Sequence, residues 1–195
     1  MNAPPLQKPL LLLLEDDETR AAQLATQAES VGWRVEIAGS IEAALRISKQ
    51  HHPDIRMVVV DVMVPELDED LEVLRAFQRK VRELVGPILK EYQETSADLE
   101  RRMDLDAQRQ SLDVAMRSLI VPDGGFLFLE EAKGEGWLAK WAYGIFSATS
   151  APDGMERLRQ MELAKENDGK WLGWLSKPVD LDVIEMMLKA GITRT

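Results

Sequence analysis

Two apolar segments of this chain each run directly into acidic residues. They are Leu11–Leu14, which is followed by Glu15, Asp16 and Asp17, and Met57–Val60, which is followed by Asp61. Four or five consecutive apolar residues without helical spacing are typical of a strand that is buried on both faces. The carboxyl ends of parallel strands lie at one edge of a sheet, and ligands bind at that edge in open α/β folds. Carboxylates gathered there repel one another, so we expect them to hold a cation or to share a proton.

A simpler interpretation is that each acid caps the helix that follows its strand, because acidic N-cap residues are common. Two later strand ends favour the first interpretation. The apolar segment 141–146 is followed by Ser147 and Ala148, and the segment 171–175 is followed, after one residue, by Lys177 and Pro178. A hydroxyl donates a hydrogen bond and an ammonium supplies a mobile positive charge. The four strand ends together therefore predict a polar site built from acids, a serine and a lysine.

The elements that must position these residues alternate between strand and helix along the chain. Strands are expected at 10–14, 33–38, 55–60, 141–146 and 171–175. Helices are expected at 18–30, 40–50, 126–133, 155–165 and 181–189. Ser40 is the expected N-cap of the second helix, and Gly191 is the expected stop signal of the last. This alternation predicts an α/β fold with a doubly wound parallel sheet of five strands.

The segment 63–120 interrupts this alternation with a long helical pattern that contains 13 acidic and 9 basic residues. Its first half carries apolar residues at three- and four-residue spacing, with one polar gap at Gln78, and its second half carries a leucine at every seventh position. These residues are Leu71, Leu74, Val81, Val85, Ile88 and Tyr92, and then Leu105, Leu112 and Leu119. The pattern resembles a coiled coil. It predicts an antiparallel helical hairpin, because both ends of the segment must return to the same sheet.

Two short motifs lie within this helical segment. Gly86-Pro87 is expected to kink the first helix or to move the turn. Thr95–Asp98 offers a capping box for the second helix. Two helices of about 24–28 residues each would project about 36–42 Å from the sheet.

The acidic pair, the single strand-end acid, the Ser-Ala pair and the Lys-Pro pair, in that order, resemble the receiver domain of bacterial two-component response regulators. The resemblance covers residues 9–62 and 121–191. It implies a flavodoxin-like sheet with strand order 2-1-3-4-5. It also implies that Asp61 is the phosphoacceptor and that Glu15 and Asp16, together with Asp61, hold Mg²⁺. Asp17 is the alternate member of the acidic pair.

The resemblance extends to three residues of the last two strands. It implies that Ser147 and Lys177 contact the phosphoryl group. Trp174, three residues before Lys177, is at the position of the aromatic switch residue of this family. A serine that moves toward a newly added charge can vacate space that the indole fills, which is a two-state switch. Ordinary packing is the alternative interpretation of Trp174.

The sequence departs from the family pattern directly after Asp61. A Pro-x-x-Gly turn is expected there, but Val64–Glu69 lacks the glycine, and Val121–Phe126 fits the turn better. We therefore expect a helical insertion, directly behind the phosphoacceptor. The expected organisation is a flexible tail at 1–8, a first receiver part at 9–62, the coiled-coil insertion at 63–120 and a second receiver part at 121–195.

Composition excludes several classes of function. A net charge of −10 argues against nucleic acid or an anionic membrane surface as a direct partner. The absence of cysteine excludes disulfides, thiolate nucleophiles and cysteine-ligated zinc. His51 and His52 lie in a polar loop, and we interpret them as solvated. No apolar stretch reaches the length of a membrane span and the start does not resemble a signal peptide, so a soluble, cytoplasmic protein is expected.

Three hypotheses for function follow. The first is a phosphoacceptor, not an enzyme on other substrates, that takes a phosphoryl group from a histidine kinase or phosphotransfer protein onto Asp61. Its output would be protein contacts through the helical segment 63–120, called the arm below, or through the face around Trp174. A homodimer is one form of such contact. The second is a pseudo-receiver that serves as a scaffold without phosphorylation. The third is a Mg²⁺-dependent hydrolase, which lacks the expected second acid two residues after Asp61, where Met63 stands.

Overall fold

The computed structural model describes residues 8–93, 99–147, 151–163, 170–177 and 181–193. Five strands form one sheet in the order β2-β1-β3-β4-β5, and each neighbouring pair is parallel. The strands are β1 (Leu10–Leu14), β2 (Arg34–Ala38), β3 (Ile55–Val60), β4 (Ala142–Ser147) and β5 (Trp171–Ser176). The expected five-stranded parallel sheet and its 2-1-3-4-5 order are confirmed.

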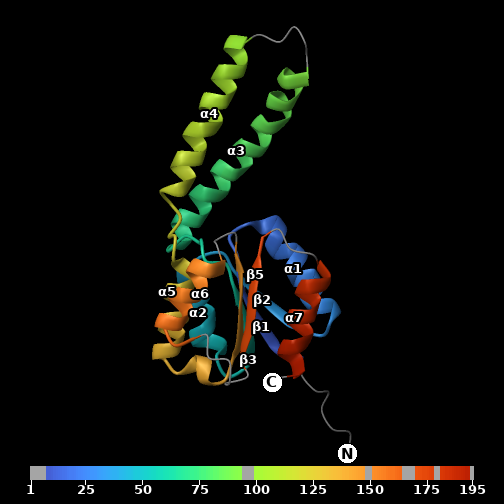
Figure 1. Cartoon of the computed structure of the whole chain (residues 1–195), viewed down its shortest axis with the longest axis vertical. Coiled ribbons are helices and arrows are strands. Elements are labelled where there is room, and N and C mark those ends of the chain that lie inside the picture. The colour runs from blue at the N-terminus through green and yellow to red at the C-terminus, as the bar shows by residue number, and fades with distance from the viewer. Residues whose placement is uncertain (1–7, 94–98, 148–150, 164–169, 178–180, 194–195) are drawn as a thin grey trace, which may run out of the picture.

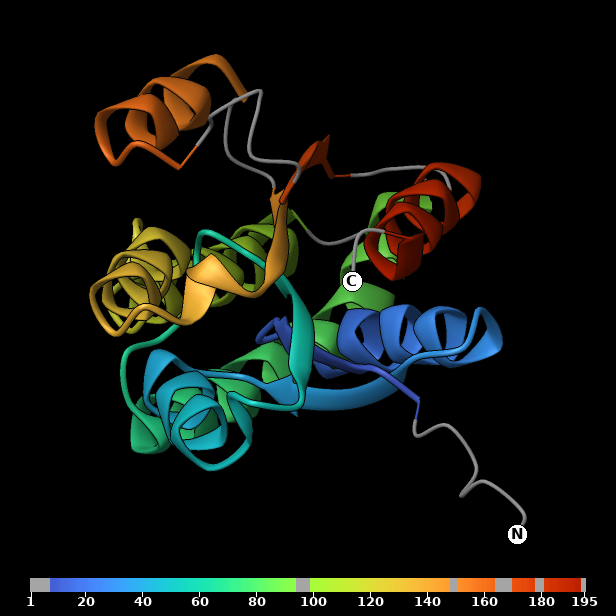
Figure 2. The same cartoon turned by 90° about the horizontal axis from the view of Figure 1, so that it is seen from below.

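Helices cover both faces of this sheet, as Figure 2 shows. One face carries α1 (Glu18–Ser30) and α7 (Leu181–Thr193). The other face carries α2 (Ile41–His51), α5 (Gly124–Gly134) and α6 (Ala151–Gln160). A short 3₁₀ helix, Trp137–Ala139, connects α5 to β4. The result is a three-layer arrangement that is typical of parallel sheets.

Side chains of β1 alternate between the two cores. Leu10, Leu12 and Leu14 belong to the cluster under α2 and α5. Leu11 and Leu13 belong to the cluster under α1 and α7. Successive side chains of a strand point to opposite faces, so an unbroken leucine run fits a strand that is covered on both sides.

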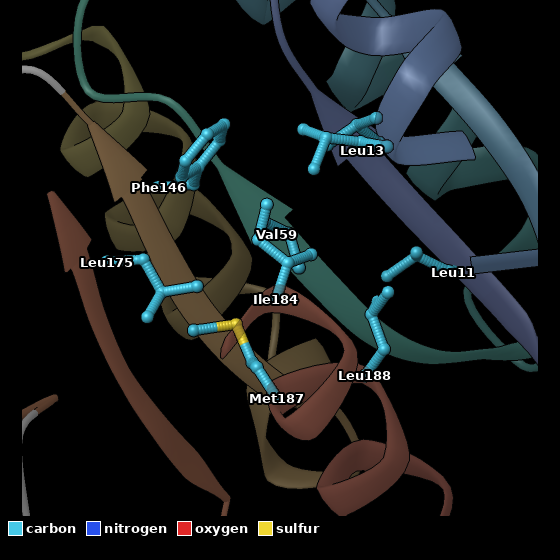
Figure 3. A pocket seen from close by; sticks show the side chains of 9 residues that line it. Leu11, Leu13, Val59, Phe146, Leu175, Ile184, Met187 and Leu188 are labelled. Atoms are coloured by element: carbon cyan, nitrogen blue, oxygen red, sulfur yellow. The ribbon is translucent and has the colours of Figure 1, made fainter. Parts of the chain in front are cut away.

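A small cavity lies between the sheet and α7. Figure 3 shows Met187 and Leu188 of α7 facing Leu175, Phe146 and Val59 of the sheet. The cavity measures about 10 Å³ and its lining is apolar. A space of this size holds one water at most, and an apolar lining offers that water no partner. We interpret it as a packing defect.

Several helix boundaries differ from the sequence expectation, and those of α6 differ most. The helix expected at 155–165 is α6, Ala151–Gln160, and residues 164–169 lie outside the described part. This helix starts earlier because Pro152 is favoured in a first turn. It ends where Glu162 adopts a φ of 56° and Leu163 N–H donates to the Leu158 oxygen at 2.8 Å.

Gly191 was expected to stop the last helix, and this prediction is wrong, because α7 continues to Thr193. A Cβ at Gly191 would lie 2.4 Å from Met57 Sδ and 3.1 Å from Trp33 Cζ2. The glycine lets α7 approach the sheet closely, so its role is in packing.

Two long helices, α3 (Asp68–Gln93) and α4 (Leu99–Arg117), project together from one end of the sheet (Figure 1). They pack against each other along part of their length. α3 runs through Gly86-Pro87, so the turn is not moved to that position. The capping box at 95–98 and tail residues 1–7 lie outside the described residues.

The chain leaves and re-enters the sheet domain at adjacent points. Val64 and Val121 form an antiparallel bridge, in which Val121 N–H donates to the Val64 oxygen at 3.0 Å. The base of the α3–α4 pair is therefore closed by a backbone hydrogen bond.

Candidate metal centre

Three buried carboxylates meet at the carboxyl edge of the sheet. Glu15 and Asp16 follow β1, and Asp61 follows β3. Their backbones are held in register, since Asp61 N–H donates to the Leu14 oxygen at 2.8 Å. Their exposed fractions are 1%, 7% and 6%, and one oxygen of each lies within 4.8 Å of the others. The structure brings together the three acids that the sequence predicted to hold Mg²⁺.

Asp17, the alternate ligand, has a different position. Its side chain is the N-cap of α1, where Oδ1 accepts a hydrogen bond from Arg20 N–H at 3.0 Å. The capping interpretation of strand-end acids is therefore correct for Asp17. The acid cluster is formed by Glu15 and Asp16 from this segment.

Lys177 lies among these acids. Its Nζ is 2.5 Å from Asp61 Oδ2 and 2.8 Å from Glu15 Oε2, and 7% of its side chain is exposed. The same ammonium lies 4.9 Å from the centre of the Phe146 ring. Arg20 NH1 adds a second, more exposed cation 3.2 Å from Glu15 Oε1. Lys177 thus neutralises charge on two acids that come from different strands.

Asp16 is the acid of the cluster whose negative charge is least balanced by nearby cations. Burial, followed by the charges of Glu15 and Asp61, raises the pKa of Asp16 to about 7. Burial also raises the pKa of Glu15, with Lys177 opposing the shift. Within the described residues no cation pairs directly with Asp16. The cluster therefore favours an additional positive charge.

The donor set fits Mg²⁺. This ion prefers carboxylate oxygens, keeps several waters, and needs only one or two protein carboxylates. Glu15, Asp16 and Asp61 supply oxygens in reach of one another, and the nearby cations leave negative charge to be balanced.

Ser147 lies at the end of β4 and is fully buried. Its backbone oxygen accepts a hydrogen bond from Lys177 N–H at 2.9 Å, which ties the ends of β4 and β5 together. Ser147 and Lys177 therefore reach the same edge as the acids. Ala148 and Pro178, the second members of their motifs, lie outside the described residues.

Trp174 lies on β5, paired with Ile145, and packs inward beneath α6. Its ring centre is 6.2 Å from that of Phe126. A Cβ at Gly154 of α6 would lie 2.0 Å from the indole, so the ring rests directly on this glycine. The indole Nε1 is buried and has no hydrogen-bond partner among the described residues. Packing is observed, and the switch role stays a prediction.

The backbone after Asp61 packs against the start of α5. Met63 N–H donates to Asp61 Oδ1 at 3.3 Å, and the Met63 side chain is 37% exposed. Gly125 N–H donates to the Val62 oxygen at 3.0 Å. A Cβ at Gly125 would lie 2.1 Å from the Asp61 backbone oxygen, which only glycine avoids. The Val121–Phe126 turn is thus placed directly beside the acid of β3.

Sequence reasoning missed Arg20, which pairs with Glu15, and Gln78 of α3. Gln78 is the more distant of the two in sequence. The Gln78 Nε2 donates to Asp16 Oδ2 at 3.3 Å, across 62 positions of the chain. The signal was present in the sequence, because Gln78 is the polar gap in the apolar stripe that contains Leu71 and Leu74. Both leucines are buried, so the gap falls where this helix face meets the acids.

Comparison with known proteins gives one sequence relative and several structural ones. No family model matches the chain. The chain is 38% identical over 71 residues to the transcriptional regulatory protein AfsQ1 of Streptomyces coelicolor, a match that covers 36% of this chain and 30% of that protein. The matched part thus spans less than a third of the relative.

Several solved structures have a fold similar to that of this chain over most of its length. A response regulator receiver domain protein from Clostridium thermocellum has a TM-score of 0.55 at 16% identity, with 95% of each chain covered. The HemR receiver domain from Leptospira biflexa has a TM-score of 0.53 at 19% identity, with 95% of each chain covered. The chemotaxis response regulator CheY4 of Vibrio cholerae has a TM-score of 0.56 at 11% identity, and the match covers 95% of this chain and 99% of that one.

These comparisons define the fold as that of response regulator receiver domains. The resemblance seen in the sequence is confirmed at this level. In the part of the chain that the structure describes, none of the helices is long and apolar enough to cross a membrane.

Proposed function

We propose that this chain is a receiver protein of a two-component phosphorelay and that Asp61 accepts a phosphoryl group from a histidine kinase or phosphotransfer protein. The observation that carries the proposal is the contact of Lys177 with Asp61 at 2.5 Å and with Glu15 at 2.8 Å, beside a third buried acid. A nucleophilic carboxylate, a fixed cation and a cation-binding acid pair are the parts that phosphoryl transfer to an acid requires.

Each residue has a separate role in this proposal. An Asp61 carboxylate oxygen forms a bond to phosphorus while the phosphorus–nitrogen bond of a phosphohistidine breaks and its electron pair returns to the imidazole. Lys177 balances charge on the acceptor and then on the phosphoryl oxygens. Ser147 donates a hydrogen bond to the same group. Glu15, Asp16 and Asp61 would hold Mg²⁺, which would supply further charge neutralisation at the phosphoryl oxygens.

We propose that α3 and α4 are a coiled-coil insertion into the receiver fold and form an output surface. The Val64–Val121 bridge supports an insertion, because it closes the base of the pair next to the acceptor loop. The turn beside Asp61 is then provided by Val121–Phe126, after the insertion. Partner proteins would contact the arm or the face around Trp174, and self-association is one form of this output. The excess of acidic charge makes nucleic acid an unfavourable partner.

A pseudo-receiver is the second candidate. The observation that favours it is the contact of Gln78 with Asp16, because a helix that occupies an acid of the site can hold the fold in one state without phosphorylation. This protein would retain the fold and the partner contacts and would form no adduct at Asp61.

An adduct experiment tests the proposal. The full chain is incubated with Mg²⁺ and a small phosphodonor such as acetyl phosphate, and in parallel with beryllium fluoride, and intact mass is measured. We expect one phosphoryl adduct on the wild type and none on Asp61→Asn. Asp17→Asn is the matched control, because Asp17 caps α1, and it should retain the adduct.

No adduct on the wild type, under conditions that modify a known receiver, would reject the phosphoacceptor and leave the pseudo-receiver. An adduct that persists in Asp61→Asn would reject the site. Turnover of an external phosphoester would instead indicate a hydrolase.

A further inference from the structure

Among the described side chains of α3, Gln78 is the one that contacts the acid cluster. Gln78 Nε2 donates to Asp16 Oδ2 at 3.3 Å. Gln78 shares a helix face with Leu71 and Leu74, since positions four and seven residues apart lie on one side of a helix. These leucines are 6% and 0% exposed. The first three turns of α3 therefore lie on the sheet domain, and Gln78 is where that contact reaches the acids.

The start of α3 is anchored on the side of α2. Ser40, the N-cap of α2, donates to Asp68 Oδ1 at 2.5 Å, and Arg46 NH1 pairs with Asp68 Oδ2 at 2.7 Å. Asp68 N–H in turn donates to Glu42 Oε2 at 3.0 Å. The first residue of α3 thus has three polar contacts with one helix.

After Asp68, α3 packs against Gly39, which follows β2, and against the start of α1. Leu71 lies against Gly39, where a Cβ would be 2.5 Å from Leu71 Cδ2. Arg75 Nε is 3.3 Å from Glu18 Oε1 at the start of α1. Between Asp68 and Gln78 the helix therefore crosses from α2 to the β1 end of the site.

Beyond Gln78, α3 continues to Gln93 as part of the projecting pair. Fifteen residues of helix extend about 22 Å. A tilt of about 10° at Gln78 would displace the far end of α3 by about 4 Å. A small change at the acid cluster is therefore converted into a measurable movement of the arm.

The Gln78 amide and a cation compete for Asp16. The hydrogen bond presents the positive N–H end of the amide to the carboxylate. A cation held by Glu15, Asp16 and Asp61 attracts the Asp16 oxygens and repels that N–H end. Asp16 is also the acid without an ion pair among the described residues, so the amide is its main side-chain partner.

We propose that the hydrogen bond between Gln78 and Asp16 is a latch that cation binding at the acid cluster weakens, so that the position of the arm reports the state of the site. This inference rests on the proposed function, because it uses the same cation site. Coupling between two sites is reciprocal. A partner that holds the arm away from the domain therefore raises the affinity of the acids for the cation by the same factor.

The test measures arm position and cation affinity in the full chain. The sequence contains no cysteine, so spin labels are placed with Met103→Cys on α4 and Met186→Cys on α7, which are 65% and 71% exposed. The inter-label distance is measured by double electron–electron resonance, with and without saturating Mg²⁺. Affinity is measured on the unlabelled protein from free Mn²⁺, with Mg²⁺ as competitor.

Three variants separate the latch from a structural effect. Gln78→Leu preserves side-chain size and continues the apolar stripe while removing the donor. Gln110→Leu makes the same substitution at an exposed position of α4 and is the matched control. Gln78→Glu adds a fourth carboxylate, which repels Asp16 until a cation attracts both.

We expect Mg²⁺ to shift the label distance in the wild type and in Gln110→Leu and to leave it unchanged in Gln78→Leu. Gln78→Leu should bind the cation about 3- to 10-fold more tightly, because no hydrogen bond competes. In Gln78→Glu the shift should reverse its sign, which loss of packing alone would not produce.

Several results would overturn the latch. They are an unchanged distance in a wild type that binds Mg²⁺, the same shift in Gln78→Leu, or weaker cation binding by that variant. Failure of the wild type to bind any cation would reject the proposed function and the latch together. Cation binding and a distance shift without an adduct at Asp61 would reject the phosphoacceptor and leave the latch.

Discussion

At the scale of single residues, the site combines three buried acids with one buried lysine. The sequence predicted all four, because strand-end positions determine which residues reach the sheet edge. It placed Glu15 and Asp16 in the acidic pair and kept Asp17 as the alternate member, since adjacent residues differ only in local geometry. Asp17 caps α1, and the cluster is formed by Glu15 and Asp16.

The charge imbalance at Asp16 has a consequence for stability. A raised pKa means that the folded protein favours the protonated acid. In chelating buffer, Asp16 therefore destabilises the fold progressively as pH rises from its ordinary pKa of 3.8 through its raised pKa of about 7, and the full cost is present above that. Asp16→Asn removes this cost.

We expect Asp16→Asn to unfold at a higher temperature than the wild type at pH 8, by at least about 4 °C, and to differ little near pH 4. Thermal unfolding followed by circular dichroism at both pH values is the measurement. Asp123→Asn, at an exposed position without a side-chain cap bond, is the control and should show no such pH dependence. A gain of equal size at both pH values would contradict the explanation. Saturating Mg²⁺ should stabilise the wild type more than Asp16→Asn.

At the scale of elements, the strands and the first two helices follow from local patterns. β1 and β3 have the predicted bounds, and Ser40 caps α2 by accepting from Ala43 N–H at 3.0 Å. The ends of α6 and α7 were not predictable in this way. Gly191 has the local signature of a stop, but tertiary packing against Trp33 and Met57 determines its role. Gln78 was missed for the same reason, because its contact depends on how α3 lies on the domain.

Gly125 gives a test of how α5 approaches the site. Gly125→Ala places a Cβ 2.1 Å from the Asp61 backbone oxygen, so α5 or the loop after β3 must shift. We expect a loss of about 2–4 kcal/mol in the free energy of unfolding, measured by urea denaturation, together with weaker cation binding. Gly134→Ala is the matched control in the same helix, where a Cβ meets nothing within 4 Å. That variant should be neutral or more stable by up to about 1 kcal/mol, and equal losses in both variants would contradict the steric explanation.

At the scale of the whole molecule, the sheet domain and the arm share a boundary that is partly buried. The sequence predicted a long helical segment here but not that the first turns of α3 are packed against the sheet domain. Leu71 and Leu74 are buried as deeply as core residues, so the first turns of α3 belong to the stable part of the protein. Within the described residues, the portion of α3 beyond Gln78 projects from the sheet domain together with α4 (Figure 1).

This division predicts the effect of shortening the arm. Leu84 and Gln108 line one groove between α3 and α4, so a short Gly-Ser link in place of residues 85–107 joins positions that already lie close together. We expect this variant to keep cooperative unfolding and cation binding. Replacing residues 65–120 instead removes both buried leucines and should cost about 3–6 kcal/mol. Urea denaturation of the two variants is the measurement, and loss of cooperativity in the shorter deletion would show that the distal arm is part of the core.

The antiparallel bridge between Val64 and Val121 also bears on how this chain folds. β3 and β4 are neighbours in the sheet, yet the whole helical segment separates them in sequence. Closing so long a loop costs about 3–4 kcal/mol of chain entropy before the strands can pair. Helices that are adjacent in sequence form contacts early, because their contact order is low. An α3–α4 pair that forms first brings Val64 and Val121 within hydrogen-bonding distance of each other. The effective loop between β3 and β4 is then much shorter, which lowers the entropic cost of pairing β4 with β3.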